Sequence, residues 1–209
     1  MDEAGAAQLL ADYPHATCTA VPDGWEERWK EFHRPAWAGG LWIGPPWIEP
    51  PTGVTRVVVD PGRAFGTGAH PTTRACIDAL ATLHRGSMLD AGCGSGVVAI
   101  AAVLLGFAPV SAIDVDEVAV EVTRATAAAN GVSLEVRAAD AVHDDLPSAD
   151  VLVANIELRV VESLLGRADA AVAVTSGYYA TEKPSAPRWE WVSRIELEGW
   201  AADVWAGRH

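Results

Sequence analysis

The chain has 209 residues, of which 50% are hydrophobic and 21% are charged, and its formal net charge is −13 at pH 7. This length and apolar content suit one sizeable folded domain, whereas proteins that bind duplex nucleic acid usually present a basic face. The composition therefore argues against stable nucleic-acid binding and favours cationic partners, such as basic proteins and amines.

The chain carries no recognisable targeting or membrane signal. Its first ten residues, MDEAGAAQLL, are acidic rather than basic, and its longest apolar run falls far short of a membrane span. Its three cysteines are scattered, so they provide neither a disulfide framework nor a metal site. We therefore expect a cytoplasmic protein without a bound metal ion, whose oligomeric state the sequence leaves open.

Residues 1–53 are expected to form a Trp-rich segment packed on the core. Within this segment, GWEERWKEFHRP at 24–35 has the apolar spacing of a short helix, and WAGGLWIGPPWIEPP at 37–51 is expected to be an extended packing segment. Residues 54–209 are expected to form the main domain, which begins with a strand over 54–60.

From residue 71 onward, helix and strand patterns alternate. Apolar residues at helical spacing predict helices over 70–85, 95–107, 116–131 and 157–169, the first of them capped by Thr72 or Thr73. Short apolar or alternating runs predict strands over 87–92, 109–116, 132–140, 149–156 and 170–177. This alternation implies an α/β fold with a doubly wound, mostly parallel sheet. Residues 188–207 instead predict an antiparallel hairpin at one sheet edge, around an EGW turn.

One stretch concentrates glycine between a predicted strand and a predicted helix. LDAGCGSGVVAIAA, residues 89–102, contains Gly92, Gly94 and Gly96, and Asp90 precedes them. Such a loop lets the backbone approach a nucleotide closely, but its spacing differs from the G-x-G-x-x-G fingerprint of dinucleotide-binding proteins. A carboxylate beside the loop disfavours a pyrophosphate and suits a ligand with a positively charged end. The loop therefore favours S-adenosylmethionine over NAD as the cofactor.

Two more acids follow predicted strands. Asp114 ends the second of these strands, where a carboxylate can accept hydrogen bonds from both ribose hydroxyls of a nucleotide. Its alternative role is to cap the helix that follows. Asp140 follows the third strand and can lie near the adenine amino group, or it can be an ordinary solvated loop acid.

A longer stretch carries a specific resemblance. VVVDPGRAFGTGAHPTTRACIDAL at 57–80, together with the glycine loop, AIDVDEVAVEVTRATAAANG and DVLVANI, closely resembles the PrmA-type methyltransferases, which modify amino groups of ribosomal protein L11. The likeness covers residues 24–177, including the order of all motifs. It implies a class I, Rossmann-like fold that depends on S-adenosylmethionine, and methyl transfer to a nitrogen atom of a ribosomal-protein-like acceptor.

The resemblance also implies roles for individual residues. Those that fall in the family's loop over the methionine end of the cofactor are Phe65, Gly66, Thr67 and His70. The three glycines fall at backbone contacts to the cofactor, and Asp114 falls at the ribose contact. Asn155 falls in the family's active-site NI motif, where its amide can bind both the cofactor and the acceptor amine. The alternatives are an ordinary loop with a capping threonine and an asparagine that caps the next helix.

The acceptor is less well defined than the cofactor. PrmA-type proteins usually begin with a small α/β substrate-recognition domain, and only a short stretch precedes GWEERW here. Contacts remote from the reacting amine normally hold a protein substrate in place. We therefore expect an active transfer site with poor activity on ribosomal protein L11 itself. Two alternatives are a methyltransferase of small amines and a protein that binds the cofactor without methylating anything.

Overall fold

The computed structural model describes residues 11–13, 15, 17, 33–61 and 66–208. The chain divides into two compact units, Met1–Phe32 and His33–His209, and all that follows concerns the second. The helix expected over 24–35 lies almost entirely outside the described residues, so it stays a prediction.

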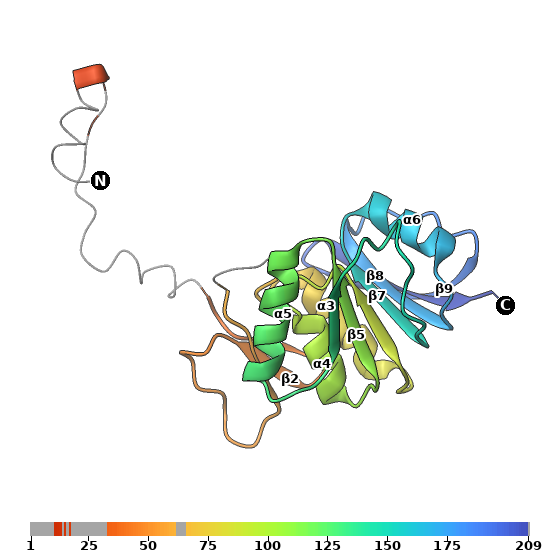
Figure 1. The fold of residues 1–209 in the computed structure, drawn as a ribbon, viewed down its shortest axis with the longest axis horizontal. Helices are drawn as coiled ribbons and strands as arrows, with labels where there is room; N and C mark the ends of the chain where they lie inside the picture. The colour runs from red at the N-terminus through yellow and green to blue at the C-terminus, as the bar shows by residue number, and fades with distance from the viewer. Residues whose placement is uncertain (1–10, 14, 16, 18–32, 62–65, 209) are drawn as a thin grey trace. The chain divides into compact units, whose positions relative to one another are not determined.

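The described part of the second unit contains two β-sheets and the helices that cover the larger one (Figure 1). In chain order the elements are β1 (Ala36–Ala38), β2 (Leu41–Gly44), β3 (Arg56–Val58), α3 (Pro71–Thr82), β4 (Met88–Ala91), α4 (Val97–Leu105), β5 (Val110–Asp114), α5 (Glu117–Ala129), β6 (Glu135–Ala138), β7 (Val151–Asn155), α6 (Leu158–Arg167), β8 (Val172–Tyr179), β9 (Trp189–Leu197) and β10 (Trp200–Gly207). Within the ranges that the structure describes, no helix combines the length and the apolar character needed to cross a membrane.

The larger sheet has the strand order β6-β5-β4-β7-β8-β10-β9. The strands from β6 to β8 are all parallel to their neighbours, whereas β10 is antiparallel to both β8 and β9. The chain therefore leaves β4 toward β5 and β6 and later returns to the other side of β4 at β7. In doubly wound sheets this reversal opens a crevice at the carboxyl ends of the strands. The predicted doubly wound sheet with a C-terminal hairpin is confirmed.

Helices cover both faces of this sheet. Along β4 the side chains alternate, so that Met88 packs in the core beneath α3 and α4 while Leu89 packs in the core beneath α6. Figure 1 shows α6 (cyan) well apart from α4 and α5 (green). Because all four residues of β4 are buried, this strand is the rigid centre from which the following glycine loop emerges.

The first helix begins differently from the sequence prediction. The N-cap of α3 is His70, whose Nδ1 accepts a hydrogen bond from the Thr72 N–H at 3.4 Å. The prediction of Thr72 or Thr73 as the cap was wrong because Pro71 occupies the first helical position. Proline is favoured there, since its φ is already helical and its missing N–H would have no helical partner.

The first strands form a small separate sheet rather than the predicted extended segment. β1 and β2 make a hairpin through Gly39 and Gly40, whose φ angles of +59° and +78° suit a type I′ turn. β3 then pairs with β2 in parallel. The side chain of Asn130, at the end of α5, joins this small sheet to the helices: it accepts from the Val58 N–H and donates to the Val58 carbonyl, both at 2.7 Å.

A buried carboxylate holds the C-terminal hairpin to the sheet. Asp203 on β10 is fully buried and accepts hydrogen bonds from the Tyr178 hydroxyl and the Trp191 indole, both at 2.9 Å. It also accepts from Nε and Nη2 of Arg194, at 2.9 and 2.8 Å. These bonds raise the pKa of the Arg194 guanidinium. A single carboxylate therefore links β8, β9 and β10.

Replacing Asp203 by alanine is expected to lower the free energy of unfolding by about 3–5 kcal/mol, because it leaves the Arg194 guanidinium nearly buried without its partner. Glu190→Gln, an exposed change on the same hairpin, is the matched control and should stay within about 0.5 kcal/mol of the wild type. Urea denaturation measures both. Equal stability of the two variants would show that the network contributes little.

Candidate functional site

A cavity of about 600 Å³ lies at the carboxyl ends of four neighbouring strands, β4, β5, β6 and β7. Its walls come from the glycine loop, from the segments that follow β5, β6 and β7, and from the first turn of α6. This volume is within the range of small-molecule and cofactor sites, roughly 300–1,000 Å³. The cavity occupies the crevice expected beside the reversal of strand order at β4.

The structure brings five of the predicted site residues to this one cavity. The predicted residues that line it are Gly92, Gly94, Asp114, Asp140 and Asn155. Four different strand ends contribute them, so the cavity wall depends on the parallel pairing of the strands. The predicted residues Gly66, Thr67, His70, Asp90 and Gly96 do not line it, and Phe65 lies outside the described residues.

The glycine loop needs its glycines for two reasons. Gly92, Gly94 and Gly96 have φ angles of +81°, +54° and +79°, in the left-handed region that glycine adopts without strain. A Cβ atom on Gly92 would lie 2.4 Å from a methyl carbon of Ile156, and one on Gly96 would lie 2.7 Å from a methyl carbon of Thr123. The loop is therefore tightly packed between β7 and α5.

Asp114 joins the end of β5 to the glycine loop. Its Oδ2 accepts a hydrogen bond from the Gly94 N–H at 2.9 Å, and its Oδ1 accepts from the Asp116 N–H at 3.0 Å. Each carboxylate oxygen can accept a further bond, so Asp114 keeps acceptor capacity toward the cavity. The alternative capping role belongs to Asp116, which is the N-cap of α5 and accepts from the Val118 N–H.

Asp140 is paired with a histidine that the sequence reasoning did not select. Its Oδ2 lies 2.8 Å from Nδ1 of His143, and its Oδ1 accepts from the Val142 N–H at 2.8 Å. The hydrogen bond from His143, followed by that from Val142, lowers the pKa of the Asp140 carboxyl. All three residues line the cavity. The D-x-x-H spacing, which brings such side chains within reach in a turn, was the available signal.

Asp90 lies beneath the glycine loop rather than on the cavity wall. Its side chain is buried, and its Oδ2 accepts a hydrogen bond from the Ala99 N–H in the first turn of α4 at 3.1 Å. Burial raises the pKa of this carboxyl to about 7, against the opposing effect of the Ala99 bond and with a further increase from Asp114. The carboxyl group thus holds the start of α4 against β4.

The loop before α3 reaches the glycine loop. Gly66, Thr67 and His70 are half-buried, while Phe65 lies outside the described residues. The Gly66 carbonyl accepts a hydrogen bond from the Ser95 hydroxyl at 2.6 Å. This bond connects the predicted loop over the cofactor to the glycine loop, whose own residues line the cavity.

Asn155 ends β7 and faces the first turn of α3. Its Nδ2 donates to the Thr73 hydroxyl at 3.3 Å. The N-cap of α6 is Glu157, so the alternative in which Asn155 caps that helix has no support. The amide is therefore held between α3 and the cavity.

Three aromatic rings meet beside α3. The His70 ring contacts Trp200 edge-on, with centroids 4.9 Å apart, and Trp200 stacks on Tyr179 at 4.5 Å. Trp200 begins β10 and Tyr179 ends β8, so both lie at the same sheet edge as the carboxyl end of β7. The sequence carries no local signal for this cluster, because only the hairpin pairing brings Trp200 back to α3.

The comparisons with known proteins agree with this geometry. The family model described as Ribosomal protein L11 methyltransferase (PrmA) matches residues 2–182. The chain belongs to this family. A ribosomal protein L11 methyltransferase from Psychrobacter arcticus is 36% identical over 219 residues, which cover 94% of this chain and 66% of that protein. One from Shewanella pealeana is 45% identical over 152 residues, which cover 69% of this chain and 51% of that protein. The chain thus spans about half to two thirds of the length of these relatives.

A solved structure shares the fold of this PrmA-family chain. The crystal structure of a ribosomal protein L11 methylase from Lactobacillus delbrueckii subsp. bulgaricus superposes with a TM-score of 0.72 at 24% sequence identity, covering 81% of this chain and 96% of that one. The class I methyltransferase fold that the resemblance implied is confirmed.

The buried Asp90 predicts a specific pH dependence of stability. Its carboxyl has an ordinary value of 3.8, the value expected in the unfolded chain, and a pKa of about 7 in the folded protein. Between these values the folded state keeps a proton that the unfolded state releases, so stability falls as pH rises from about 4 to about 7.

Asp90→Asn should remove the loss of stability between about pH 4 and pH 7, because the asparagine side chain does not ionise and can still accept a hydrogen bond from the Ala99 N–H. We compare the free energy of unfolding of Asp90→Asn with that of the wild type. The difference, variant minus wild type, is expected to increase by about 2–3 kcal/mol from pH 5 to pH 8. Urea denaturation at several pH values measures it. Parallel pH profiles of the two proteins would contradict the raised pKa.

Proposed function

We propose that this PrmA-family chain binds S-adenosylmethionine in the cavity at the carboxyl ends of β4 to β7 and transfers its methyl group to an amino group of a protein. The observation that carries the proposal is the convergence of the predicted glycine, carboxylate and amide positions on one cavity. The family membership of the chain supports the same reaction.

The described residues fit this cofactor. Asp114 would accept hydrogen bonds from the ribose hydroxyls, Asp140 would lie near the adenine, and the glycine loop would approach the amino-acid portion. The cavity wall presents carboxylates, and its one basic side chain among the described residues, His143, is already paired with Asp140. Such a wall suits a ligand with sulfonium and ammonium groups better than the pyrophosphate of NAD.

Asn155 is the residue proposed to act at the transfer step. When bound, the cofactor would supply a methyl group on a positively charged sulfur. A neutral acceptor amine would form the N–C bond as the C–S bond breaks, S-adenosylhomocysteine would leave with the electron pair of that bond, and the methylated nitrogen would release a proton to solvent. The bond to Thr73 positions the Asn155 amide, which can then accept a hydrogen bond from the acceptor amine and direct the nitrogen lone pair. Such a transfer depends on positioning and needs no covalent nucleophile.

The aromatic cluster would border the path of the acceptor. His70 and Thr73 both belong to the start of α3, and Trp200 and Tyr179 extend the apolar surface from there along the sheet edge. Apolar rings around the reacting amine would exclude water from it. We propose that these rings, together with Asn155, form the acceptor side of the site.

Radiolabelled S-adenosylmethionine tests the reaction. Incubation with purified proteins, ribosomal protein L11 first, and separately with a panel of amines and amino acids should label a protein. Asn155→Ala is expected to lower kcat by about a hundredfold or more through loss of positioning. Labelling of small amines alone would support the small-amine alternative. Cofactor binding without transfer to any acceptor would contradict the proposal.

A further inference from the structure

One acidic side chain of the cavity has no hydrogen-bond or ion-pair partner among the described residues. Glu157 is the N-cap of α6, yet its side chain makes no capping hydrogen bond. It is exposed and lines the cavity. Among the described residues, its carboxylate forms no hydrogen bond or ion pair. Since glutamate is also not a favoured N-cap residue, capping of α6 does not account for this carboxylate.

The position of Glu157 separates it from the proposed cofactor contacts. Those contacts follow β4, β5 and β6, whereas β7 lies on the opposite side of β4. Asn155, Glu157 and Val160 therefore form a second wall of the cavity. A single residue separates Asn155 from Glu157, so their Cα atoms lie at most about 7 Å apart.

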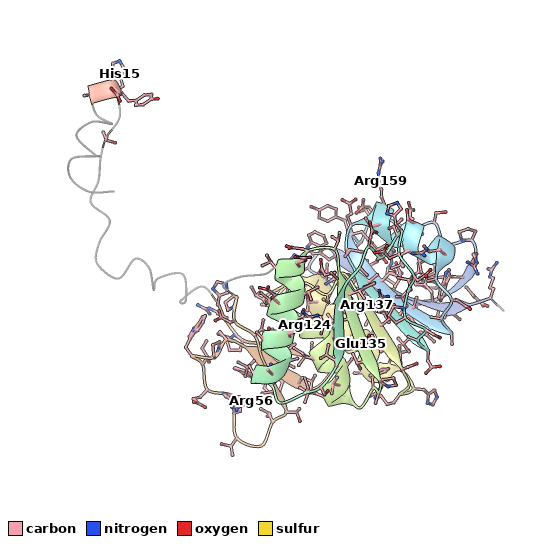
Figure 2. All side chains as sticks on the ribbon, viewed as in Figure 1. His15, Arg56, Arg124, Glu135, Arg137 and Arg159 are labelled. Carbon is pink, nitrogen blue, oxygen red and sulfur yellow. The ribbon has the colours of Figure 1, made fainter. Side chains whose placement is uncertain are left out.

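No basic group on the described part of the cavity wall neutralises Glu157. His143, the basic residue on the described part of the wall, is paired with Asp140 at 2.8 Å. Arg159, in the first turn of α6, projects away from the domain (Figure 2). The second wall therefore presents an uncompensated negative charge beside the amide proposed to hold the reacting amine, and such a charge selects a cationic partner.

We infer that Glu157 is a specificity-determining residue that binds a second, cationic group of the methyl acceptor, next to the amine held at Asn155. The inference rests on the proposed function. It defines the acceptor as an amine with another positive charge a few bonds away, such as a lysine side chain beside a second basic residue. Glu157 makes this ion pair through its carboxylate, while Asn155 contacts the reacting nitrogen.

The test measures acceptor binding by the whole chain saturated with S-adenosylhomocysteine, at physiological salt. The probes are two end-blocked tripeptides, Lys-Lys-Lys and Gln-Lys-Gln. The wild type is expected to bind the first about tenfold more tightly, and Glu157→Gln should reduce this preference to about twofold. Glu190→Gln, an exposed change on β9 away from the cavity, is the matched control for net charge and should keep the preference.

The outcomes separate this inference from the proposed function. A full preference in Glu157→Gln, or a wild type that binds S-adenosylhomocysteine but shows no preference, would overturn the inference and leave the proposed function standing. Weaker binding of S-adenosylhomocysteine by Glu157→Gln would also overturn it, since Glu157 would then contact the cofactor. A wild type that fails to bind S-adenosylhomocysteine would overturn both.

Discussion

The hydrogen bond from the Gly94 N–H to Asp114 joins the ends of two neighbouring strands, and the cavity depends on it. Gly92 packs against Ile156 beyond β7 with no space for a Cβ atom. The loop after β4 is therefore fixed to β5 on one side and to β7 on the other. Any residue larger than glycine at position 92 would separate these strand ends. The rigidity of the cavity wall therefore depends on the parallel pairing of β4 with β5 and with β7.

Two buried carboxylates show how differently the fold stabilises a charge. Asp203 accepts hydrogen bonds from a guanidinium and two further donors, and through them it links three strands. Asp90 has a single backbone N–H at the positive end of α4, and burial raises its pKa to about 7. The first arrangement serves the hairpin that carries Trp200, and the second supports the glycine loop from below.

Much of the site could be predicted because the carboxyl ends of parallel strands meet at one edge of a sheet. Alternation of helix and strand patterns predicts the glycine loop, Asp114 and Asp140 at that edge, and the resemblance to the PrmA family implies the role of Asn155 there. The burial of Asp90 was not predictable. Strand periodicity indicates the face of the sheet on which a side chain lies, but not that the Ala99 N–H lies within hydrogen-bond distance there. The contact of Trp200 with His70 depends on the C-terminal hairpin. The hairpin of β1 and β2 had a signal, the Gly39–Gly40 pair, that was interpreted only as part of an extended segment.

Titration calorimetry of the wild-type chain with S-adenosylhomocysteine and, separately, with NAD tests the central claim most directly. The account predicts binding of S-adenosylhomocysteine in the micromolar range and no binding of NAD. Asp114→Ala should weaken the binding of S-adenosylhomocysteine by about 1–3 kcal/mol, because the hydrogen bonds from the ribose hydroxyls to a charged acceptor are lost. Micromolar binding of NAD without binding of S-adenosylhomocysteine would contradict the account.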